Sequence, residues 1–442
     1  MGLRPRRWAR GLDPHVTLGL AAGLSLLVEI ARHEASGTGY PFAIVEACIA
    51  AAALVLVSAA PERIRLGPLL AITLAFHAGW VGIELGLFDF TGHTDSLRVY
   101  RTEGNALLHG HYPRSEYPPG AVLLFAVEAW LGGGKTLVSN ALAMIPFQLA
   151  TVAATWLLRS RYSSWFAALL AIWPANAFVW TFRFDLVPTA LFAVGLLLAW
   201  RERWTLAGAA LGLGATVKWT PGLSALVIAV WLFSSRRWAA GARHAAAWAV
   251  VVLVVHLPFL IWAPSELEAA YRRQGGRGIT AESIYYLPLR AFGLAHLPAH
   301  IWEDAGAPHW TKAAAVAVQA VVVGAIVAVA VWRRNRMASA LALAALAPVA
   351  FLLTNRIFSP QFLIPIFTGL AVSASLVGLR TRGEMVWVGA LAALAALAGA
   401  LVFPWTVPSR PLAMAALTGS ALIATLWLVA RAAGAGRAGE PV

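Results

Sequence analysis

The feature that most constrains this chain is a succession of long apolar runs, each about as long as a membrane-spanning helix. An α-helix of about 20 apolar residues crosses a hydrocarbon core of about 30 Å. Hydrophobic residues make up 60% of the 442 residues and charged residues 12%, whereas soluble domains are about half apolar and a quarter charged. The sequence therefore predicts an all-α polytopic membrane protein and excludes soluble enzymes and nucleic-acid-binding proteins.

The apolar runs also predict how many helices cross the membrane. Long runs lie at about 15–32, 42–60, 66–88, 136–158, 164–182, 186–200, 242–262, 309–332, 338–354, 359–379, 385–402 and 411–431. Two shorter runs, 205–218 and 221–235, are separated by Thr220-Pro221, which predicts a helix broken near residues 218–221. We therefore expect a bundle of about 12–14 transmembrane helices.

Basic residues predict the orientation of these helices. The chain carries 34 Lys and Arg against 20 Asp and Glu, and the basic residues form short clusters between the runs. Such clusters accumulate in cytoplasmic loops. They all fall on one side if the run 119–131, about 20 Å long as a helix and too short to cross, lies on the membrane surface. This predicts cytoplasmic termini in a plasma-membrane protein, with segments 89–118 and 263–308 outside.

This topology divides the chain into alternating membrane and outer segments, without a separate soluble domain. They are N-terminal transmembrane helices over 1–88, an outer loop with a surface helix over 89–135, transmembrane helices over 136–262, a second outer loop over 263–308, and C-terminal transmembrane helices over 309–442. Polar residues gather in the two outer loops, so we expect the functional site on the outer face.

The first outer loop contains carboxylates, an arginine and several histidines directly after a membrane helix. Charge beside a membrane is solvated, paired or functional, because burying an isolated charge is costly. A solvated interfacial loop is therefore one interpretation and a reactive site is the other. His93, His109 and His111 superficially resemble a metal cluster, but their spacing is that of no known zinc site, and we predict no metal ligands here.

Several short motifs follow one another along the chain and together resemble the family 87 glycosyltransferases. They are Asp95-x-Leu97-x-Val99-Tyr100, Leu107-Leu108-x-Gly110-x-Tyr112-Pro113, Tyr117-Pro118-Pro119, Phe184-Asp185, Gly212 to Lys218 with Pro221, Gly276-Arg277 with Glu282-Ser283, and Arg356 with Ser359-Pro360-Gln361-Phe362. Members of this family are polytopic GT-C-type enzymes, common in actinobacteria, that use polyprenyl-phosphate sugars. The resemblance covers about residues 88–370; two spans precede the one leading into the outer loop, more than the family pattern has.

The resemblance implies a role for each motif. The acceptor of such an enzyme is a sugar hydroxyl, which a carboxylate activates as general base. The motif places this base at Asp95, with Asp89 as the rival carboxylate. The leaving phosphate requires cations, and Lys218, Arg277 and Arg356 are the expected donor-phosphate ligands.

The remaining motif residues are expected to contact the acceptor or the sugar. They are Arg98, Tyr100, His111, Tyr117, Asp185, Glu282 and Gln361. Other interpretations stay open for some residues. Lys218 is also compatible with snorkelling to the membrane surface, Arg277 with pairing to Glu282, and Asp185 with pairing to Arg183. Tyr100, Tyr112, Tyr117, Trp219 and Trp262 are candidates for stacking on sugar rings, whereas an interfacial aromatic belt accounts better for most of the 20 tryptophans.

The resemblance predicts a membrane glycosyltransferase that moves a sugar from a polyprenyl-phosphate donor to a lipid-linked glycan or glycolipid at the outer face. Mannose is the first expectation, and arabinofuranose on decaprenyl phosphate is the alternative. A single displacement with one base would invert the anomeric centre. No cofactor is predicted, and a divalent metal is left open. The rival classes are a secondary transporter, which would carry its ionisable groups at mid-bilayer, and a lipid-linked-saccharide flippase.

Overall fold

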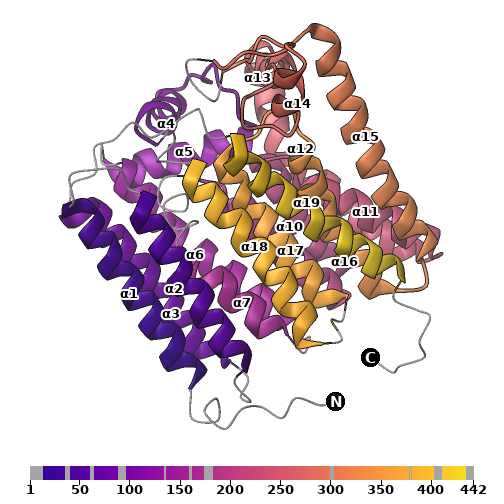
Figure 1. Ribbon diagram of the computed structural model, residues 1–442. Helices are drawn as coiled ribbons and strands as arrows, with labels where there is room; N and C mark the ends of the chain where they lie inside the picture. The colour runs from indigo at the N-terminus through magenta and orange to yellow at the C-terminus, as the bar shows by residue number, and fades with distance from the viewer. Residues whose placement is uncertain are drawn as a thin grey trace.

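The computed structural model describes residues 13–34, 40–59, 64–87, 96–133, 136–158, 162–173, 183–298, 303–377, 379, 381–402 and 411–434. These residues form 18 α-helices and no strand (Figure 1). Six of the helices are long and apolar enough to cross a membrane, and further apolar helices are shorter. The described chain is therefore an all-α polytopic membrane protein, as its apolar runs predict.

The helices follow one another with short connections. In chain order they are α1 (Pro14–Glu34), α2 (Tyr40–Ala59), α3 (Leu66–Val81), α4 (Arg101–Leu108), α5 (Pro119–Gly132), α6 (Thr136–Leu157), α7 (Ser163–Ile172), α9 (Leu186–Trp200), α10 (Trp204–Val217), α11 (Pro221–Ser234), α12 (Trp238–Trp262), α13 (Pro264–Gly276), α14 (Tyr286–Ala291), α15 (His309–Trp332), α16 (Met337–Leu353), α17 (Leu363–Leu376), α18 (Arg382–Val402) and α19 (Pro411–Gly434). Two π-helical segments, η2 (Gly82–Leu87) and η3 (Ser96–Tyr100), precede α4.

The core lies around α16 and α17, whose side chains are almost all buried. These helices are apolar on every side, which is typical of helices surrounded by other helices. By contrast, α12 and α15 bury few of their side chains and expose long apolar faces. Faces of this kind suit contact with lipid, because in water they would expose a large apolar surface.

The short polar helices α4, α13 and α14 gather at one end of the bundle, which we call the loop face (Figure 1). α1 begins and α19 ends at the opposite end. The loop face therefore brings together described parts of the two segments that the charge pattern assigns to one side of the membrane, residues 101–108 and 264–291.

The predicted break near residue 218 is present. α10 ends at Val217 and α11 begins at Pro221, where the missing N–H of proline costs no helical hydrogen bond. The start of α5 packs closely against the end of α10, since a Cβ on Gly120 would lie 2.7 Å from the Thr216 carbonyl oxygen. Glycine at this position therefore allows α5 to lie directly beside the break.

Candidate functional site

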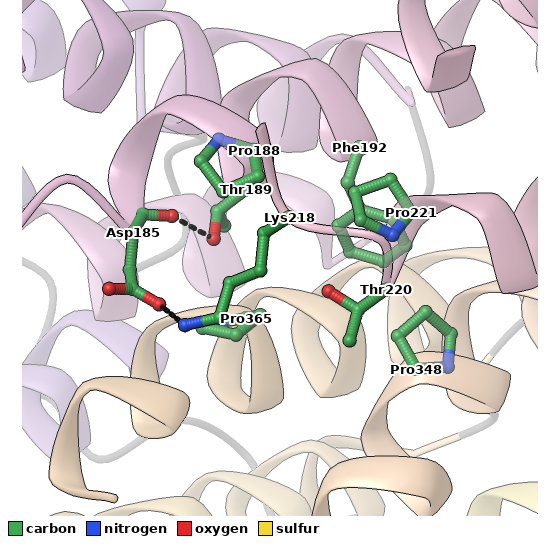
Figure 2. A pocket seen from close by; sticks show the side chains of 9 residues that line it. All are labelled: Asp185, Pro188, Thr189, Phe192, Lys218, Thr220, Pro221, Pro348 and Pro365. Carbon is green, nitrogen blue, oxygen red and sulfur yellow. Dashed lines mark hydrogen bonds and ion pairs between the residues drawn. The ribbon is translucent and has the colours of Figure 1, made fainter. Parts of the chain in front are cut away.

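The predicted cation Lys218 lies at the break and pairs with Asp185 at the start of α9 (Figure 2). The two side chains border a small pocket, and its lining residues are Asp185, Pro188, Thr189, Phe192, Lys218, Thr220, Pro221, Pro348 and Pro365. The Asp185 side chain is 1% exposed and that of Lys218 18%. The sequence did not predict that Lys218 pairs with Asp185, because the two residues are 33 positions apart in the chain.

Aromatic rings hold the Lys218 ammonium group in place. Its Nζ lies 4.6 Å from the ring centroid of Phe362 and 5.7 Å from that of Phe184, both within cation–π range. Lys218 thus points into the protein among these groups, and the snorkelling interpretation does not describe this arrangement.

Four rings from separate segments form an aromatic cluster, which consists of Tyr100, Tyr117, Phe125 and Phe184. The rings of Tyr100 and Phe125 stack with centroids 4.2 Å apart, and Tyr117 meets Phe184 edge-on at 5.2 Å. Tyr100 is buried, whereas Tyr117 is partly exposed. The cluster packs the end of η3, the Tyr117 segment and the start of α9 together beside Lys218.

The two predicted arginines lie on the α13 side of the site. Arg277 directly follows α13, and its Nη1 lies 3.6 Å from Glu116 Oε2. The proposed pairing of Arg277 with Glu282 is therefore not the ion pair that forms. Arg356, between α16 and α17, donates from Nε to the Arg277 carbonyl oxygen over 2.9 Å. Both arginines thus belong to the same corner of the loop face.

Glu282 is buried behind these cations. Its Oε1 has no hydrogen-bond partner among the described residues. Burial raises the pKa of this carboxyl group to about 8, although the nearby charges of Arg183 and Arg277 act to lower the pKa. Glu282 is therefore protonated near neutral pH and can donate one hydrogen bond.

Other predicted residues lie at the edges of the site or outside the described residues. Arg98 and His111 are exposed, and Gln361 is partly buried, accepting a hydrogen bond from the Ser359 hydroxyl. Asp89 and Asp95 fall outside the residues that the structure describes. Asp95 immediately precedes η3, whose last residue belongs to the aromatic cluster.

A group of side chains with metal-ligand spacing occurs elsewhere in the described residues, at the end of α1 and in η2. Glu29, His33 and Glu84 bring one ligand atom each within 4.8 Å of one another. However, Arg32 Nη2 contacts Glu29 and lies 2.6 Å from Glu84 Oε1 and 2.8 Å from His33 Nε2. The guanidinium group therefore occupies the position where these three residues would hold an ion.

Sequence reasoning missed some residues of the site. Glu116, the partner of Arg277, was not predicted. Phe184 belongs to a quoted motif, but its packing against Lys218 and Tyr117 was not predicted. Glu116 directly precedes the motif residue Tyr117, so the sequence held a signal for its position. The sequence suggests Arg183 only as a partner for Asp185, whereas in the structure its charge also acts to lower the pKa of Glu282.

The fold and the site define a class of protein: a multi-pass membrane protein with cations and aromatic rings gathered at one end of its bundle. The profile of glycosyltransferase family 87 matches residues 116–360, more than half of the chain. The chain belongs to glycosyltransferase family 87 and is a glycosyltransferase. No curated protein and no solved structure matches it.

Proposed function

We propose that this glycosyltransferase takes its sugar from a polyprenyl-phosphate donor at the loop face, which faces away from the cytoplasm. The convergence of Lys218 and Arg277 on the aromatic cluster carries the proposal. A phosphodiester is an anion. Lys218 lies beside Phe184 of the aromatic cluster, and Arg277 pairs with Glu116, which directly precedes Tyr117 of the same cluster. The apolar faces of α12 and α15 suit a donor that stays in the lipid.

The reaction in this proposal is a single displacement. The acceptor hydroxyl oxygen attacks the anomeric carbon of the sugar, and its proton passes to the Asp95 carboxylate as general base. The bond between the anomeric carbon and the phosphate oxygen breaks, and polyprenyl phosphate leaves with the electron pair. Lys218 and Arg277 stabilise the negative charge that develops on the phosphate. The product then has the opposite anomeric configuration to the donor.

The acceptor in this proposal is a glycolipid or lipid-linked glycan, bound beside the aromatic cluster. Tyr117 is partly exposed and offers a ring edge and a hydroxyl group to a sugar. Tyr100 is buried against Phe125, so we give it a packing role within the cluster rather than a sugar contact. Mannose is the first donor sugar to test and arabinofuranose is the second.

The test is a transfer assay on the purified protein with radiolabelled mannosyl and arabinofuranosyl polyprenyl phosphates. We expect label to move to a membrane glycan fraction while polyprenyl phosphate is released. Asp95→Asn should retain donor binding and lose about 10²–10⁴-fold in turnover, the usual contribution of a positioned base. Asp89→Asn is the matched carboxylate control and should lose much less.

The outcomes separate the parts of this proposal. Transfer from neither donor would refute the polyprenyl-phosphate donor. Transfer with near-normal turnover in Asp95→Asn, or with a larger loss in Asp89→Asn, would move the base to another carboxylate. If label is transferred from just one of the two donors, that donor's sugar is the sugar the enzyme transfers.

A further inference from the structure

The last backbone carbonyl groups of α13 are held by the side chain of Arg356. The final four carbonyls of a helix have no partner within the helix. Arg356 Nη2 donates to the carbonyl oxygens of Gln274 (3.0 Å) and Gly275 (2.8 Å), and its Nε donates to that of Arg277 (2.9 Å). One guanidinium group thus binds three carbonyls at the end of a single helix.

The hydrogen bonds from Arg356 to the end of α13 are stabilising for two reasons. The carboxyl end of a helix carries partial negative charge, and hydrogen bonds from a guanidinium group are stronger than neutral ones. Arg356 is only 9% exposed, so its bonds to α13 are shielded from water. The Thr280 amide also donates to the Arg356 carbonyl oxygen over 3.0 Å. The segment after α13 is therefore fixed to residue 356 through both backbone and side chain.

The fixed end of α13 in turn reaches the first outer segment. Gln274 Nε2 donates to the Glu116 carbonyl oxygen over 3.0 Å, and Arg277 Nη1 lies 3.6 Å from Glu116 Oε2. The side chain of Arg277 is 34% exposed, so it remains accessible to a ligand. Of the two arginines, Arg277 is open to solvent and Arg356 is engaged with the backbone.

We propose that Arg356 is a positioning residue that acts through Arg277 and does not itself bind the donor. It fixes the end of α13, and the fixed end sets the position of the Arg277 side chain for the donor phosphate. This inference rests on the proposed function for the role of Arg277, while the contact between Arg356 and α13 stands independently of it.

A double-mutant cycle distinguishes positioning from direct phosphate binding. Arg277→Gln and Arg356→Gln should each raise the donor KM about tenfold, the loss of one charge-assisted contact, with kcat changing less. Because both changes remove the same contact, the double variant should have no higher KM than the worse single variant. A KM that rises about a hundredfold in the double variant would overturn the inference, since independent contacts add.

The conservative variant Arg356→Lys gives a second criterion. Lysine retains the charge but is a single-point donor and cannot reproduce the planar fork that binds three carbonyls. Its donor KM should therefore match that of Arg356→Gln. Recovery of the wild-type KM in Arg356→Lys would instead indicate a direct charge contact with phosphate. Arg290→Gln, an exposed arginine on α14 that bonds Tyr286, is the matched control and should leave the KM unchanged.

Amide hydrogen exchange tests the contact without any donor. In Arg356→Gln, peptides covering residues 264–280 should exchange faster, because the end of α13 loses its hydrogen-bond partner. In Arg277→Gln they should exchange as in the wild type. Unchanged exchange in Arg356→Gln would overturn the inference. If the wild type shows no transfer from polyprenyl-phosphate donors, the proposed function fails, but the exchange result still decides whether Arg356 holds α13.

Discussion

At the scale of single residues, the Lys218–Asp185 pair shows how a charge can be kept inside a membrane enzyme. Removing one member of a buried ion pair leaves an uncompensated charge, which costs more than removing both. Asp185 is almost fully buried, so its carboxylate depends on the ammonium group of Lys218. Lys218 therefore stabilises the buried carboxylate, and we propose that it also binds the donor.

A pair of variants separates these roles. Lys218→Met should lower the free energy of unfolding by about 3–5 kcal/mol, the usual cost of breaking a buried pair. The double variant Lys218→Met/Asp185→Asn should recover most of that stability because no charge is left unpaired. If Lys218 binds the donor phosphate, the double variant should still bind donor poorly. Thermal unfolding and donor titration measure the two effects; normal donor affinity in the double variant would restrict Lys218 to a structural role.

The buried carboxyl group of Glu282 predicts how stability depends on pH. Burial raises its pKa from 4.5 to about 8, so between these values the folded protein holds a proton that the unfolded chain has lost. Stability from this group is therefore present below about pH 4.5 and is lost as pH rises toward 8. Glu282→Gln cannot ionise, so its unfolding midpoint should fall less between pH 5 and 8. Parallel pH profiles for the two proteins would contradict the assignment.

At the scale of elements, the residues of the candidate site lie at the ends of helices. The site forms where α9 begins, where α10 and α11 meet, and where the segment after α13 packs against the segment between α16 and α17. Helix ends carry unpaired backbone groups, so charged side chains are stabilised there. Another charged cluster lies at the end of α1 and in η2, where Arg32 binds the carboxylates of Glu29 and Glu84.

The Arg32 cluster should contribute strongly to the stability of the N-terminal helices. Arg32→Met leaves the Glu29 and Glu84 carboxyl groups buried without their cation. We expect a loss of about 3–5 kcal/mol in the free energy of unfolding. Arg431→Met is the control, because its pair with Glu384 is about a quarter exposed and should be worth less than about 1 kcal/mol. Equal effects in a thermal unfolding assay would contradict this account.

At the scale of the whole molecule, the helix bundle has two ends, and the basic clusters predict which end faces the cytoplasm. α4, α13 and α14 lie at the loop face, and the start of α1 lies at the other end (Figure 1). The basic clusters predict that the loop face is outside the cell. The proposed donor site then opens toward the outer leaflet.

Cysteine labelling tests this orientation. In a Cys48→Ala background, Glu268→Cys on α13 should react with an impermeant maleimide in intact cells, because its side chain is 68% exposed at the loop face. Glu202→Cys between α9 and α10, also exposed, should react only after permeabilisation. The reverse pattern would invert the topology and place the site in the cytoplasm.

The sequence by itself determined the class of fold, because the length and apolar character of a run decide whether it crosses a membrane. It also predicted the break at Lys218 from Pro221 and the family from the order of short motifs. Those motifs are local, and each is visible within a few residues.

Only the tertiary structure decided which motif residues meet. The partners of Lys218 and Arg277 lie 33 and 161 residues away, and no local pattern relates them. Likewise, the sequence predicts Arg356 as a phosphate ligand, yet its guanidinium N–H groups donate hydrogen bonds to carbonyls at the end of α13. Side-chain pairing in the bundle depends on how helix ends pack against one another, and that packing is a property of the folded chain as a whole.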